Sequence, residues 1–80
     1  MKTMTCKQLG GPCDHELKGA TADEVITAQD QHLREMVKSG DVAHEPALTA
    51  MKGRWKRPVS GLKWYRATKA AFAALPDDGT

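Results

Sequence analysis

The stretch Cys6-Lys7-Gln8-Leu9-Gly10-Gly11-Pro12-Cys13 holds both cysteines of an 80-residue chain. Its last residues before Cys13 favour a turn, because glycine reaches backbone angles that other residues avoid and proline fixes its own φ. Such a loop can bend back and bring the two sulfurs close together. In a reducing compartment, a close pair of thiols binds a metal, forms a redox pair or is a coincidence.

The residues on either side of this loop predict a β-hairpin. Residues 1–7 partly alternate, with Met4 and Cys6 on one face, which is typical of a strand. Residues 13–18 are the expected return strand, with Leu17 as its inward residue. Gly19 then ends the hairpin.

A long helix should follow the hairpin. The sequence Thr21-Ala22-Asp23-Glu24 is a capping box, in which the threonine oxygen and the Glu24 carboxylate accept hydrogen bonds from backbone amides at the helix start. The helix is expected to run to about Ser39, with Gly40 as a left-handed cap. Its apolar stripe has helical spacing and consists of Val25, Ile26, Leu33, Met36 and Val37.

His32 lies at the edge of this stripe, one turn before Met36, and should therefore point toward the hairpin. Cys6, Cys13 and His32 supply three of the roughly four ligands that zinc or a similar divalent ion prefers. The fourth ligand stays open. The candidates are His44 as the first choice, followed by His15, Asp14, Asp41 and water. The alternative interpretation treats both cysteines as small buried apolar residues and His32 as a packed edge residue.

Two more helices are predicted in the second half of the chain. Pro46 fits the first turn of one helix, and Pro58 stops it. Ser60 is expected to cap the next helix, from Gly61 to about Leu75, which Pro76 ends. The apolar residues expected to mark one face of that helix are Leu62, Tyr65, Phe72 and Leu75.

Charge is distributed unevenly along the chain. Residues 1–45 hold five basic and eight acidic residues, whereas residues 46–76 hold seven basic residues and no Asp or Glu. Basic residues neutralise phosphates and aromatic side chains stack on bases. Nucleic-acid binding is therefore an alternative function, through Lys52, Arg54, Lys56, Arg57, Lys63 and Arg66. Trp55 and Trp64 are nevertheless expected to be core anchors. The basic residues of segment 46–76 could also attract the acidic segment 1–45 of another copy.

The length of the chain and its residue pattern limit the domain organisation and the classes of function that remain. Eighty residues form at most one domain, expected over residues 1–76 with a hairpin-and-helix part (1–40), a two-helix basic extension (41–76) and a tail (77–80). No apolar run approaches the roughly 20 residues that span a bilayer, so we expect no membrane partner and a cytoplasmic location. The sequence contains no glycine-rich phosphate loop, no HExxH motif and no nucleophile with an evident base, so none of these motifs indicates an enzyme.

The first 32 residues resemble a family of small bacterial proteins of unknown function, described as predicted small metal-binding proteins. The matching features are Lys2-Thr3, Cys6, Cys13, Gly19-Ala20-Thr21-Ala22-Asp23-Glu24-Val25 and His32. The resemblance implies a hairpin followed by a helix, with Cys6, Cys13 and His32 in ligand positions. Family members tend to carry a second histidine five residues after the first, and Val37 occupies that place here. Either His44 takes that role or the four-ligand site is incomplete.

Together these features predict an α+β fold, a short antiparallel β-hairpin followed by three helices packed as one small domain. The favoured function is binding of a zinc-like ion through Cys6, Cys13, His32 and His44, in a structural or regulatory role. Nucleic-acid binding and a redox or disulfide role of the thiol pair are the alternatives.

Overall fold

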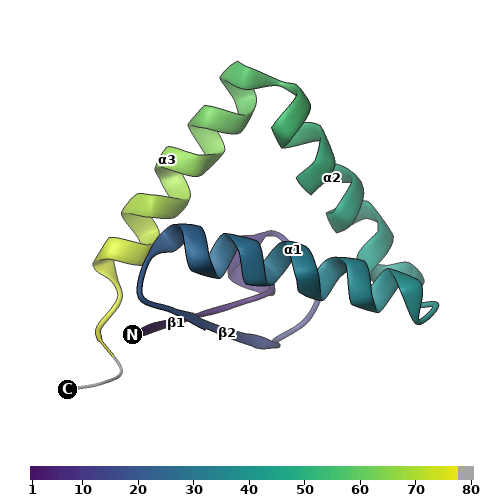
Figure 1. Cartoon of the computed structure of the whole chain (residues 1–80), viewed down its shortest axis with the longest axis horizontal. Helices are drawn as coiled ribbons and strands as arrows, with labels where there is room; N and C mark the ends of the chain where they lie inside the picture. Colours follow the sequence, from purple (N-terminus) through teal and green to yellow (C-terminus); the bar gives the residue numbers. More distant parts are fainter. Residues whose placement is uncertain (78–80) are drawn as a thin grey trace.

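The chain forms a two-stranded antiparallel hairpin followed by three helices, which confirms the predicted α+β fold (Figure 1). The computed structural model describes residues 1–77, so the last three residues of the predicted tail lie outside the described residues. Strand β1 (Lys2–Thr5) pairs with β2 (Glu16–Gly19), and Met4 stands opposite Leu17. Both of these side chains are buried, so one face of the hairpin forms part of the core.

The connection between the strands is longer and more structured than the sequence predicted. Residues Lys7–Leu9 form the short 3-10 helix η1, and Gly10 follows it at φ +99°, a left-handed conformation that favours glycine. The Cys6 carbonyl accepts hydrogen bonds from the amides of Leu9 and Gly11, at 3.1 and 2.8 Å. The predicted start of the return strand at Cys13 is therefore wrong. Cys13 still lies in the loop, and β2 begins at Glu16.

Helix α1 (Ala22–Lys38) begins and ends close to the predicted residues. Thr21 Oγ1 accepts a hydrogen bond from the Glu24 amide at 3.2 Å, as a capping box requires. In a capping box Glu24 is expected to accept from the Thr21 amide, but here it accepts from the Ala20 amide, one residue earlier, at 2.6 Å. Gly40 adopts the predicted left-handed conformation at φ +98°.

The second half of the chain contains the short 3-10 helix η2 (Val42–His44), α2 (Glu45–Lys56) and α3 (Pro58–Ala74). Pro46 lies in the first turn of α2, as predicted. The predicted start of the third helix at Gly61, with Ser60 as cap, is wrong. Arg57 is extended (φ −115°, ψ 97°) because the residue before proline avoids helical angles, and Pro58 itself opens α3.

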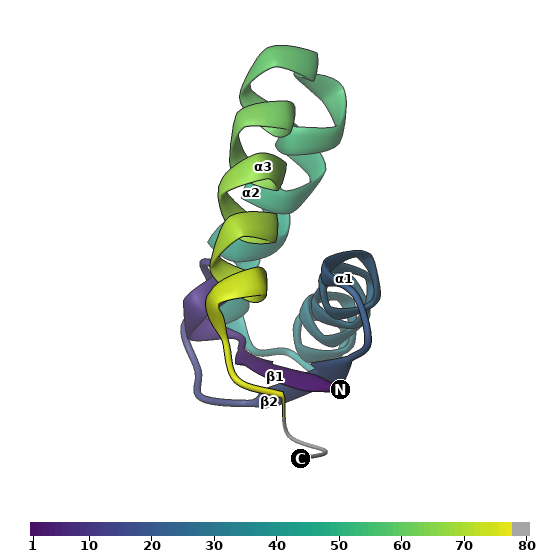
Figure 2. The same ribbon diagram turned by 90° about the vertical axis from the view of Figure 1, so that its left-hand side faces the viewer.

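Helices α2 and α3 form a hairpin whose turn stands away from the strands and from α1 (Figures 1 and 2). The two helices approach closely beside their turn, where a Cβ atom on Gly61 would overlap the Arg54 carbonyl. The far end of α3 returns to the β-hairpin. There the Lys2 ammonium donates hydrogen bonds to the carbonyls of Phe72 and Ala73, at 3.1 and 3.0 Å.

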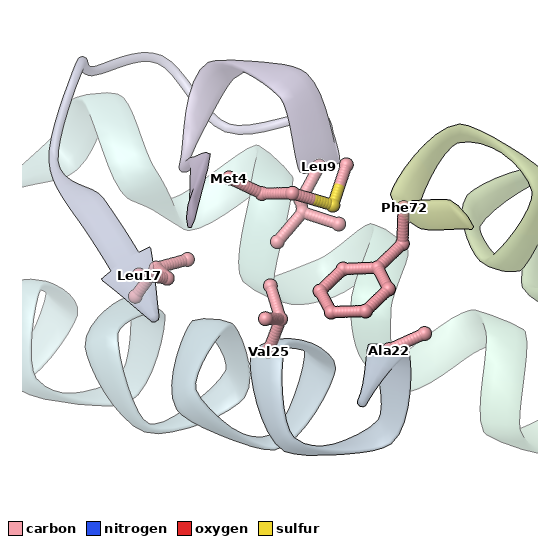
Figure 3. Packing of buried hydrophobic residues seen from close by; sticks show 6 residues of the cluster. All are labelled: Met4, Leu9, Leu17, Ala22, Val25 and Phe72. Carbon is pink, nitrogen blue, oxygen red and sulfur yellow. The ribbon is translucent and has the colours of Figure 1, made fainter. Parts of the chain in front are cut away.

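The buried apolar side chains form two clusters. The first joins the hairpin to α1 and the end of α3, and Figure 3 shows its side chains converging from these elements: Met4, Leu9, Leu17, Ala22, Val25 and Phe72. The second joins the loop after β1 to α1 and α2 through Cys6, Leu33, Leu48 and Met51. Trp64 packs against both clusters and so connects them.

Two apolar side chains of the α2–α3 hairpin contradict the predicted core. Trp55 is 59% exposed and Leu62 is 48% exposed, whereas Trp64 is partly buried under the Arg54 guanidinium, 4.2 Å from the ring centroid. Helical spacing alone could not reveal this difference, because it does not show how far the hairpin extends beyond its neighbours. Within residues 1–77, none of the helices is long and apolar enough to cross a bilayer.

Candidate metal centre

Four side chains with metal-binding atoms meet where the β-hairpin, α1 and η2 come together. One ligand atom each from Cys6, Cys13, His32 and His44 can be chosen so that all four lie within 4.8 Å of one another. Cys6 directly follows β1, Cys13 lies in the loop before β2, His32 is on α1 and His44 ends η2. The structure thus brings together the three ligands that the sequence proposed and the first choice for the fourth.

Two of the separations among these atoms are close to those of a tetrahedral donor set. Zinc binds sulfur at about 2.3 Å and imidazole nitrogen at about 2.0–2.1 Å, so tetrahedral angles place a sulfur and a nitrogen roughly 3.6 Å apart. Cys13 Sγ lies 3.3 Å from His32 Nε2 and 3.4 Å from His44 Nε2. Two thiols and two imidazoles at such separations are compatible with a metal-binding site.

Three of the four donors are buried, and Cys13 is partly exposed. Cys6 is completely buried, and His44 and His32 are 2% and 9% exposed, whereas Cys13 is of intermediate exposure. Both sulfurs are free thiols. A set of four protein donors is typical of a structural zinc site, because a catalytic site keeps a position open for water or substrate.

The carboxylate of Asp41 lies close to the second ring nitrogen of His44. The ring Nδ1 lies 3.1 Å from Asp41 Oδ2, at ion-pair distance but without the alignment of a hydrogen bond. Burial works to lower the pKa of His44, but contacts with Cys13 and Asp41 outweigh burial and raise the pKa above its ordinary value of 6.5. The imidazole in turn lowers the pKa of the Asp41 carboxyl. Metal-binding histidines characteristically have such a carboxylate behind the ring.

His32 has a different environment. Burial lowers the pKa of its imidazole, and the nearby His15 and His44 add to the effect. The ring of His15 stacks on His32 in parallel, with centroids 4.3 Å apart. His32 therefore favours the neutral form, which is the form that binds a metal.

Sequence reasoning missed one residue of this site, Gln29. Its side chain is completely buried, and Nε2 donates to Cys6 Sγ at 3.3 Å and to the Cys6 carbonyl at 3.4 Å. The signal was present, because Gln29 lies four residues from both Val25 and Leu33 and so occupies the apolar stripe. A buried amide needs hydrogen-bond partners, and here one of them is a candidate ligand.

The other candidates for the fourth ligand do not join the group of four. His15 is exposed and stacks on His32. Asp14 is exposed and lies 3.5 Å from the Lys7 ammonium. Asp41 contacts His44 instead of taking a place among the four donors.

The residues of the nucleic-acid alternative lie on α2, α3 and the turn between them. Five of these side chains are exposed: Lys52, Lys56, Arg57, Lys63 and Arg66. Arg54 differs from them, because it is half-buried over Trp64 and burial lowers the pKa of its guanidinium.

Comparison with known proteins adds no identification: no family model, curated protein or solved structure matches this chain. The resemblance to predicted small metal-binding proteins therefore stays a prediction.

Proposed function

We propose that this protein binds a zinc-like divalent ion through Cys6, Cys13, His32 and His44, and that the ion has a structural role. The observation that carries the proposal is the convergence of four soft or borderline donors, from four separate segments, within 4.8 Å. Thiolate and imidazole together favour zinc over magnesium or calcium, which prefer oxygen.

The fold supports a structural role. A chain of this size has a thin core, and small domains commonly depend on a metal for stability. An ion held by these four residues would join the β-hairpin, α1 and η2 at the edge of the second apolar cluster, which contains Cys6 and against which Cys13 packs. The free energy of ion binding would then contribute directly to the free energy of folding of the protein.

The contacts around the donors also fit an ion. Gln29 donates a hydrogen bond to the Cys6 sulfur, an arrangement that stabilises a thiolate. Asp41 lies at ion-pair distance from His44 Nδ1, where a carboxylate commonly orients a ligand histidine. A redox role for the thiol pair is less well supported, because Cys6 is completely buried and reactive cysteines are partly exposed.

The decisive experiment is elemental analysis of protein purified without chelator, combined with a count of free thiols before and after chelator treatment. We expect about one zinc-like ion per chain and two thiols that react freely only after the metal is removed. Substoichiometric metal with two freely reactive thiols would refute the proposal. No metal and no free thiol would favour a disulfide instead.

Nucleic-acid binding stays an untested alternative. The exposed cations of α2 and α3 are available to phosphates, but the guanidinium of Arg54 lies over the ring of Trp64. A salt-dependent affinity for an oligonucleotide would support that alternative.

A further inference from the structure

The turn between α2 and α3 carries an apolar surface that the metal centre does not use. We call Trp55, Pro58, Val59 and Leu62 the apolar tip. Val59 is 83% exposed, Trp55 59% and Leu62 48%. Hollows of about 390 and 240 Å³ open on this surface, and Pro58 and Leu62 line both of them. Figures 1 and 2 show the turn at the end of the molecule farthest from the β-hairpin.

Cations surround the apolar tip. Lys56 and Arg57 precede Pro58, and Lys63 and Arg66 line the larger hollow beside Leu62. All four side chains are exposed, and residues 46–76 contain no Asp or Glu. A partner that complements this surface must therefore offer negative charge and an apolar layer together.

Two other partners fit less well. A symmetric contact between two copies through the apolar tip would place these cations against their own counterparts, because a two-fold interface uses the same patch twice. A single-stranded nucleic acid would use the cations and Trp55, but Val59 and Leu62 are aliphatic and offer no aromatic face to a base.

We propose that the apolar tip docks on a membrane surface of anionic phospholipid. Trp55, Val59 and Leu62 enter the boundary between headgroups and acyl chains, where tryptophan and aliphatic side chains of surface-bound helices lie. The surrounding cations contact the negative headgroups. This surface contact needs no spanning helix, so it replaces the expectation of no membrane partner, which considered spanning segments alone.

The test measures binding of the full chain to sedimented vesicles of mixed phosphatidylglycerol and phosphatidylcholine, with vesicles of phosphatidylcholine alone for comparison. The variant Val59→Ser/Leu62→Ser removes aliphatic side chains from the tip without changing charge. Its matched control is Val42→Ser, which alters a valine that is 72% exposed on η2, outside the tip. Circular dichroism checks that all three proteins are equally folded.

We expect the wild-type protein and the control to bind the anionic vesicles, with affinity for them at least about tenfold lower in the double variant. Binding should shift the tryptophan emission to shorter wavelength, and Trp55→Phe should remove that shift. Equal affinity of the double variant and the control would overturn the proposal, since it would indicate charge attraction alone. Binding to a single-stranded oligonucleotide but not to vesicles would overturn it in favour of nucleic acid.

Discussion

Replacing Gly11 with alanine tests the metal centre through one added methyl group. Gly11 has no positive φ, so its backbone accepts alanine. The new Cβ, however, would overlap the Cys6 sulfur and stand 3.0 Å from Gln29 Nε2. Cys6 is completely buried, so the sulfur must move by a distance on the order of 1 Å to restore ordinary van der Waals contact.

A shift of this size is large for a metal ligand. Metal–ligand distances hold to within about 0.2 Å, so the displaced sulfur loses its bond. We expect Gly11→Ala to lower zinc affinity by at least about 100-fold, since changes even to residues behind the ligands cost about 10–100-fold. Overpacking should also destabilise the metal-free protein, by about 1–3 kcal/mol.

The assay is competition for zinc against a chromophoric chelator, with thermal unfolding of the metal-free and metal-loaded forms. Two other glycines serve as controls. Gly10→Ala strains a residue at φ +99° and approaches only the flexible end of Arg54, so it should cost stability without a large loss of affinity. Gly53→Ala, with nothing within 4 Å, should stabilise α2 by up to about 1 kcal/mol. A Gly11→Ala protein that binds zinc within a few-fold of wild type would refute the assignment of Cys6 as a ligand.

The remaining predictions concern the two histidines. His32→Ala should lose far more zinc affinity than the exposed change Gln31→Ala and should destabilise chiefly the metal-loaded form; equal destabilisation of both forms would make His32 a packing residue only. Asp41→Asn keeps the oxygen that accepts from the Ala43 amide but removes the charge behind His44, so a chelator titration should show about 10–100-fold weaker binding. In metal-free protein, the raised His44 pKa contributes stability that is fully present below pH 6.5 and lost as pH rises through the folded-state pKa. The lowered His32 pKa has the opposite sign, with stability present above pH 6.5 and lost as pH falls through the folded-state pKa. Zinc needs neutral imidazoles, so protons compete with it below the raised His44 pKa. The difference in melting temperature between metal-loaded and metal-free protein should therefore decrease as the pH falls below that pKa, and a constant difference would contradict this.

Local signals explain why part of the site could be predicted from the sequence. The capping box at Thr21 fixes where α1 begins, and the apolar stripe fixes its buried face, so His32 could be directed toward the hairpin in advance. The position of His44 could not be derived in this way, because it depends on Gly40 and on the η2 turn that follows. Gln29 also lies within the apolar stripe, but a stripe defined by apolar residues alone does not reveal a buried amide.

The errors in the second half have a common physical origin. A proline both stops one helix and opens the next, and Ser60 resembled a cap although Pro58 had already begun α3. Trp55 and Leu62 have helical spacing like that of buried residues, but the pattern does not show that the α2–α3 turn extends beyond its neighbours. Burial at such a turn depends on tertiary contacts, which short-range periodicity does not contain.

The division of the core into two clusters has a consequence for how the protein opens. Only the second cluster contains candidate ligands, whereas the first consists of apolar side chains of the β-hairpin, α1 and α3. Local opening follows cooperative units of this kind, and a ligand that stabilises one unit slows amide hydrogen exchange mainly there. Metal removal should therefore speed exchange first around Met51 in α2 and in the loop after β1, with slower change in β1, β2 and the first turns of α1. Trp64 packs against both clusters, so we expect any spread of the effect to the first cluster to pass through this side chain.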